Sequence, residues 1–84
     1  MNYSSRLQQL YEETNTGLKE MLAIKEFNVK WDRSIILITQ ISSYIEILSV
    51  FMFDENRDEE IKRYYMKFNN LLVEIIGIRR EWLK

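Results

Sequence analysis

The stretch SIILITQISSYIEILSVFMF, from Ser34 to Phe53, decides the fold of this chain. Between Ile35 and Phe53, thirteen of nineteen residues are apolar or aromatic, and Glu46 carries the only formal charge. A helix that is apolar on nearly all sides is buried either in protein or in lipid. The segments on both sides mix polar and apolar residues at helical spacing, so we expect two amphipathic helices to cover a central one.

Turn-forming residues are scarce, which favours an all-α fold. Proline is absent, and glycine occurs only at Gly17 and Gly77. Strand-and-turn folds need such residues at short, regular intervals. A length of 84 residues suits one domain, residues 1–84. The sequence therefore predicts an antiparallel up-down-up three-helix bundle, with helices at about 5–27, 33–53 and 57–83.

The first predicted helix has one apolar face and one weak segment. Ser5 and Gln8 fit a capping box at its start. The segment Thr14–Gly17 contains weak helix formers, so a break there is an alternative to one continuous helix. The apolar face follows steps of three and four residues and consists of Leu7, Leu10, Tyr11, Leu18, Met21 and Leu22.

The first turn is expected between Asn28 and Asp32. Asparagine tolerates the left-handed conformation that ends many helices, so Asn28 is the predicted C-terminal stop. Asp32 is a suitable N-cap for the central helix. Trp31 and Ile36 then occupy the two positions of a hydrophobic staple.

The third predicted helix has the most regular pattern. Its first turn is acidic and its last turn is basic, as the helix dipole favours. Tyr65, Leu72 and Ile76 widen its apolar seam on one side. The seam fits either the core of the bundle or a coiled-coil dimer face, and we expect the core. It consists of Ile61, Tyr64, Phe68, Leu71, Ile75, Ile78 and Trp82.

The few polar residues of the central helix form a narrow strip. Two interpretations are open: a solvent-facing edge, or a close helix–helix contact in which small side chains let two backbones approach. In the second case Glu46 would need a basic partner. The strip consists of Thr39, Ser42, Ser43, Glu46 and Ser49.

A membrane span is the main alternative for Ile35 to Phe53, because nineteen residues are long enough to cross a bilayer. Glu46 would cost about 2.5 kcal/mol or more inside the hydrocarbon region. The flanking amphipathic helices also need an apolar partner, which a buried central helix provides. We therefore expect a soluble chain.

Composition argues against several classes of function. The chain has no cysteine and no histidine, which excludes disulfides and removes the commonest metal ligand and general base. The acidic residues around Asp54 and Glu60 lack the spacing and the glycine of a calcium loop. We expect no enzymatic activity, no cofactor and no metal.

Charge and the N-terminal sequence bear on partners and location. The net charge of −1 and the interleaving of basic with acidic residues do not favour nucleic-acid binding. A DNA regulator built on a helix-turn-helix is therefore a lesser alternative. The N-terminal sequence lacks the apolar run of a signal peptide, so we expect a cytoplasmic protein.

The apolar surface exceeds what a three-helix core can absorb. We expect the central helix to expose part of Leu37, Ile47, Val50, Phe51 and Phe53, and such patches mark interaction sites. The sequence thus predicts a small protein–protein interaction module (an adaptor, chaperone, immunity or regulatory factor) that binds itself as a homodimer, another protein, or both. The expected partner-binding residues are Tyr44, Phe51, Phe53, Tyr65 and Trp82.

Overall fold

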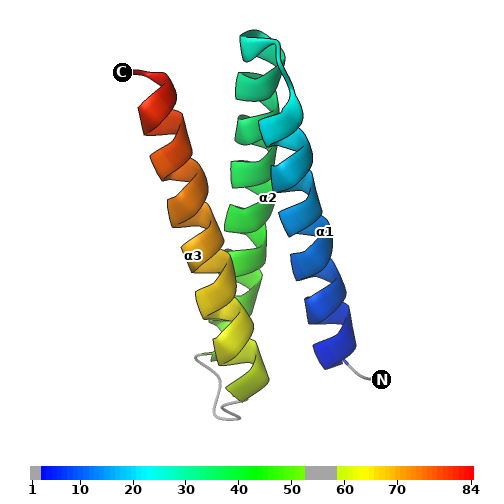
Figure 1. Cartoon of the computed structure of the whole chain (residues 1–84). Coiled ribbons are helices and arrows are strands. Elements are labelled where there is room, and N and C mark those ends of the chain that lie inside the picture. The colour runs from blue at the N-terminus through cyan, green and yellow to red at the C-terminus, as the bar shows by residue number, and fades with distance from the viewer. Residues whose placement is uncertain (1–2, 53–58) are drawn as a thin grey trace.

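The computed structural model describes residues 3–52 and 59–84, and these residues form three α-helices. They are α1 (Tyr3–Ala23), α2 (Phe27–Met52) and α3 (Glu59–Trp82). Consecutive helices run in opposite directions (Figure 1). The predicted all-α, up-down-up three-helix bundle is confirmed.

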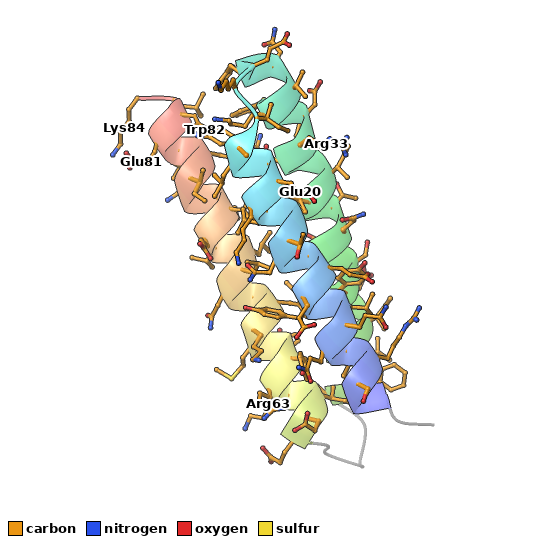
Figure 2. The ribbon with its side chains drawn as sticks, turned by 45° about the vertical axis from the view of Figure 1, so that its right-hand side comes forward. Glu20, Arg33, Arg63, Glu81, Trp82 and Lys84 are labelled. Atoms are coloured by element: carbon orange, nitrogen blue, oxygen red, sulfur yellow. The ribbon has the colours of Figure 1, made fainter. Side chains whose placement is uncertain are left out.

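The three helices do not share the core equally. α2 and α3 lie alongside one another as an antiparallel pair, and α1 lies across one side of that pair (Figures 1 and 2). The Cα atoms extend over 45 × 23 × 14 Å, so the bundle is long and thin. One side of the α2–α3 pair is consequently covered by α1, and the other side is not.

The core is centred on Phe68, which is fully buried. The ring of Phe68 lies 5.7 Å from that of Tyr11 on α1 and 5.4 Å from that of Tyr44 on α2, measured between ring centroids. The predicted seam of α3 faces this core, so it is used within the chain. The buried apolar residues are Leu18, Met21, Leu37, Ile41, Leu48, Tyr64, Phe68, Leu71 and Ile75.

The first turn lies earlier than the sequence predicts, so the expected boundary at Asn28 to Asp32 is wrong. α1 ends at Ala23 and α2 begins at Phe27, where the carbonyl of Glu26 accepts a hydrogen bond from the amide of Lys30. Asn28 and Asp32 are therefore exposed residues inside α2 and do not act as stop and cap. With the helix start moved, Trp31 and Ile36 are not a staple.

The aromatic residues of this first turn explain the shift. Phe27 and Trp31 are four residues apart, and both rings pack against Trp82 of α3, at centroid distances of 6.1 and 6.3 Å. That packing requires residues 27–31 to be helical. Tertiary contact therefore outweighs the local capping preference of Asn28 and Asp32.

α1 runs without a break through its weak segment, and it begins at Tyr3, so Ser5 is inside the helix and is not its N-cap. Thr14 is buried and donates from Oγ1 to the Leu10 carbonyl, at 2.7 Å. Gly17 brings α1 close to α2, because a Cβ added there would lie 3.2 Å from Cδ2 of Leu37. Leu37 is only 7% exposed for this reason, contrary to the expectation that it is partly exposed.

The two glycines give a matched test of this close approach. An added Cβ at Gly77 meets nothing within 4 Å, so Gly77→Ala should raise the free energy of unfolding by about 0.5–1 kcal/mol through helix propensity. Gly17→Ala has the same intrinsic gain but must displace Leu37, so we expect it to be the less stable variant. Urea unfolding followed by circular dichroism at one fixed protein concentration measures both. Equal stabilisation by the two substitutions would contradict the close approach.

Candidate functional site

α2 leaves much of its apolar surface uncovered. Among residues 3–52 and 59–84, it is the one helix long and apolar enough to cross a membrane, judged by length and composition. Only 17% of its most apolar 18-residue window is buried within the chain. The expected exposure of Ile47, Val50 and Phe51 is confirmed, and Phe53 lies outside the described residues.

One apolar surface runs along the α2–α3 pair on the side away from α1. On both helices the residues follow alternating steps of three and four, the repeat of coiled-coil seams. These steps place them on the flank opposite the Leu37 side of α2 and the Tyr64 side of α3, which face α1. We call this surface the open face; it consists of Ile35, Ile38, Ser42, Ile45, Ser49 and Met52 on α2 and Tyr65, Asn69, Leu72 and Ile76 on α3.

Burial varies across the open face. Ile38, Ile45, Tyr65 and Leu72 are half-buried and pack against the core, so they lie nearest to where the two helices meet. Farther out, Ile35 and Ile76 are 44% and 37% exposed. The open face therefore has half-buried apolar side chains along its middle and exposed aliphatic side chains along its edges.

Three residues of the open face are polar: Ser42, Ser49 and Asn69. Asn69 is half-buried and donates from Nδ2 to the Tyr65 carbonyl, at 3.1 Å. Ser49 donates to the Glu46 carbonyl, at 2.7 Å, and Ser42 is exposed. These hydrogen bonds of Asn69 and Ser49 stay within their own helices. The remaining donor and acceptor groups of the two side chains can therefore bond to water or to a partner.

The polar strip of α2 faces solvent within this single chain. Thr39 donates to the Ile35 carbonyl at 2.9 Å, and Ser43 donates to the Thr39 carbonyl at 3.0 Å. Both residues are exposed, as are Ser42 and Glu46. The contacts within the chain therefore match the solvent-edge interpretation and not a helix–helix contact inside the bundle.

A second apolar strip lies on the other flank of α2. We call it the outer stripe; Val29, Ile36, Ile47 and Phe51 form it and are 42–56% exposed. Next to the outer stripe, a partly open cleft of about 280 Å³ lies between α1 and α2. Its lining includes Glu20, Arg33 and Ile36. Figure 2 labels Glu20 on α1 and Arg33 on α2 at this place.

An aromatic cluster closes the end of the bundle beyond α1. It joins Phe27, Trp31 and Trp82, with ring centroids 5.9–6.3 Å apart. The Arg79 guanidinium lies 4.1 Å from the centroid of the Trp31 ring, which favours a cation–π contact. The Nε of Arg79 is buried and has no acceptor among the described residues.

Two surface ion pairs join residues that are three apart in the chain. The described residues contain no group of three or more His, Cys, Asp or Glu that could hold a metal ion. Arg63 pairs with Glu60 at 2.8 Å and Lys84 pairs with Glu81 at 2.9 Å, both on the surface of α3 and its C-terminal end (Figure 2). Such exposed pairs contribute little to stability.

The five sequence-predicted binding residues do not share one surface. Tyr44 packs against Phe68 and supports the core, Phe51 belongs to the outer stripe, and Tyr65 belongs to the open face. Trp82 belongs to the aromatic cluster, and Phe53 lies outside the described residues. Whether any of them binds a partner stays a prediction.

The sequence analysis recognised Ile35 and Ile76 as apolar positions of their helices, but it did not assign them or Asn69 to a binding surface. The available signal was a second series of three-and-four steps, displaced by one residue from the core seam of each helix. Seen alone, that series looks like a widening of the core seam. Its separate role is visible only once α1 is known to cover the other side.

Trp82 and its neighbour Leu83 give a test of the aromatic cluster. Trp82→Ala should lower the free energy of unfolding by about 2 kcal/mol, less than a fully buried tryptophan, because Trp82 is half-buried against two other rings. Leu83→Ala is the control, because Leu83 is 71% exposed, and it should change stability by less than about 0.5 kcal/mol. Thermal unfolding compares the two, and a Trp82→Ala variant as stable as the parent would contradict a structural role.

No known family model matches this chain, and neither a curated protein nor a solved structure shows significant similarity to it. Function must therefore be inferred from the chain's own exposed surface.

Proposed function

We propose that this chain is a small non-enzymatic protein–protein interaction module that binds through the exposed apolar surface of α2. The observation that supports this proposal is the low burial of α2: only 17% of its apolar 18-residue window is buried within the chain. Transfer of exposed apolar surface from water to a partner is favourable by about 25 cal/mol per Å², before the entropic cost of association is subtracted. A thin bundle that leaves apolar side chains of α2 exposed is suited to binding another protein surface.

The spacing of the exposed residues supports recognition by a helix face. Ile36, Ile47 and Phe51 are separated by eleven and four residues, which places them on one side of α2. Polar residues such as Gln40 and Ser43 lie between them. Apolar side chains on one side of a helix are the anchors by which helices bind in a groove of a partner.

Site-specific photo-crosslinking in living cells tests the proposal. A photoreactive amino acid at Ile47 should give discrete protein adducts, because this position is 56% exposed on the surface proposed to bind. The same amino acid at Glu12, an exposed position on the polar side of α1, is the control and should give few adducts. Mass spectrometry identifies what is attached. Failure of Ile47 to exceed Glu12 in protein adducts would refute the proposal.

Membrane association is a second candidate, favoured by the length and apolar composition of α2. Two features weigh against it. Glu46 lies in the middle of the apolar stretch, and Leu37, Ile41 and Leu48 are already buried against α1 and α3. A bilayer span would require those contacts to be given up or taken into the membrane together with the polar faces of α1 and α3.

Flotation with lipid vesicles separates the two candidates. The purified chain should stay at the bottom of a density gradient containing vesicles of neutral and anionic phospholipids, with or without added salt. Recovery of most of the chain with floated vesicles at high salt would favour the membrane candidate, because salt weakens only electrostatic attachment. A soluble protein of similar size serves as the control.

A further inference from the structure

We propose that the open face binds a second copy of this chain. In the resulting dimer, α2 and α3 of both copies form a four-helix core, and each α1 lies on the outside. This inference goes beyond the proposed function, because the open face is a different surface from the outer stripe and its partner is named here. It concerns the side of the α2–α3 pair away from α1, which Figures 1 and 2 show as the side that no helix covers.

The heptad pattern supports a helical partner that lies along the whole pair. α3 carries one seam through Phe68 and Leu71 that faces the core, and a second through Asn69 and Leu72 that faces outward. α2 repeats the arrangement, with Leu37 and Ile41 inward and Ile38 and Ser42 outward. A helix with two adjacent seams can pack against helices on two sides at once. Among the described residues, α1 packs on one of these two sides of the α2–α3 pair, and no helix packs on the other (Figure 1).

The polar residues of the open face favour a second copy over an unrelated apolar partner. The contact between Tyr44 and Phe68 fixes how α2 and α3 are aligned along the bundle axis. Because the two helices are antiparallel, Ser42 and Asn69 lie at nearly the same position along that axis. If a two-fold axis parallel to the helices relates the two copies, Ser42 of each copy lies next to Asn69 of the other. The dimer would then contain two such contacts. A hydroxyl and an amide can satisfy each other by hydrogen bonding. A single asparagine in a seam is also a known means of setting register.

Charge complementarity favours the same orientation. With the two-fold axis along the helices, α2 of one copy packs antiparallel against α3 of the other. Glu46 then lies within about a turn of Lys62 of the second copy. Asp32 likewise lies near Arg80 of the second copy at the other end. All four residues are exposed in the single chain and flank the apolar seams.

The size of the open face is adequate for a stable dimer. A helix of 24 residues is about 36 Å long. Two neighbouring helices are together about 20 Å wide. The open face therefore offers roughly 700 Å² per copy, close to the roughly 800 Å² per partner of standard protein interfaces.

Ile35 and Ile36 provide a matched pair of variants. They are adjacent isoleucines, 44% and 49% exposed, but Ile35 lies on the open face and Ile36 on the outer stripe. Sedimentation over a wide concentration range should show a dimer for the parent chain and for Ile36→Glu. Ile35→Glu should be a monomer, with the dimer dissociation constant raised about 100-fold or more. Circular dichroism confirms that both variants remain helical.

Cysteine substitutions test the orientation, because the chain has no native cysteine. Mixed Ser42→Cys and Asn69→Cys chains should be joined by a short thiol cross-linker far more efficiently than either variant alone. Preferential joining of Ser42→Cys to itself would overturn the proposed axis. A strictly monomeric parent chain, or a dimer broken by Ile36→Glu and not by Ile35→Glu, would overturn the dimer itself. If such a monomer still gives protein adducts at Ile47, the proposed function stands without this dimer.

Discussion

The contact of the Phe68 ring with the rings of Tyr11 and Tyr44 is the interaction on which the rest of the structure depends. Phe68 of α3 is fully buried, and it touches Tyr11 of α1 and Tyr44 of α2. It is thus a point at which the three helices meet through one side chain. Aromatic rings bury a large area and prefer offset or edge-on geometries, so this contact also sets how the helices are aligned along their lengths. The contact between Tyr44 and Phe68 also determines which residues of α2 lie opposite which residues of α3, including Ser42 and Asn69.

A core built in this way is small, and that has a consequence for the surface. Among residues 3–52 and 59–84, α1 is the one further helix that packs on the α2–α3 pair, and it covers one side (Figures 1 and 2). α2 and α3 nevertheless carry apolar residues on more than one flank, including Ile35, Ile47 and Ile76. The chain therefore folds with more apolar surface than it can bury alone. Small domains often need oligomerisation or a partner for this reason.

Much of the fold can be predicted from the sequence because its signals are periodic. The seam from Ile61 to Trp82 recurs at three and four residues throughout α3, and the absence of proline leaves few alternatives to helix. The first turn is different. Asn28 and Asp32 have good local capping chemistry, yet α2 begins before both, because Phe27 and Trp31 pack against Trp82 some fifty residues later. A local preference of about 1 kcal/mol does not decide a boundary against such a contact.

The surface is less predictable than the fold. The sequence alone determined that the chain is all-helical, that α3 has a continuous core seam, and that the central helix has apolar surface to spare. Only the tertiary structure decided which surface that is: Gly17 lets α1 approach and bury Leu37, and Tyr44 turns to Phe68. The physical reason is that periodicity records which residues avoid water, whereas the direction from which a neighbouring helix approaches depends on side chains far apart in the sequence.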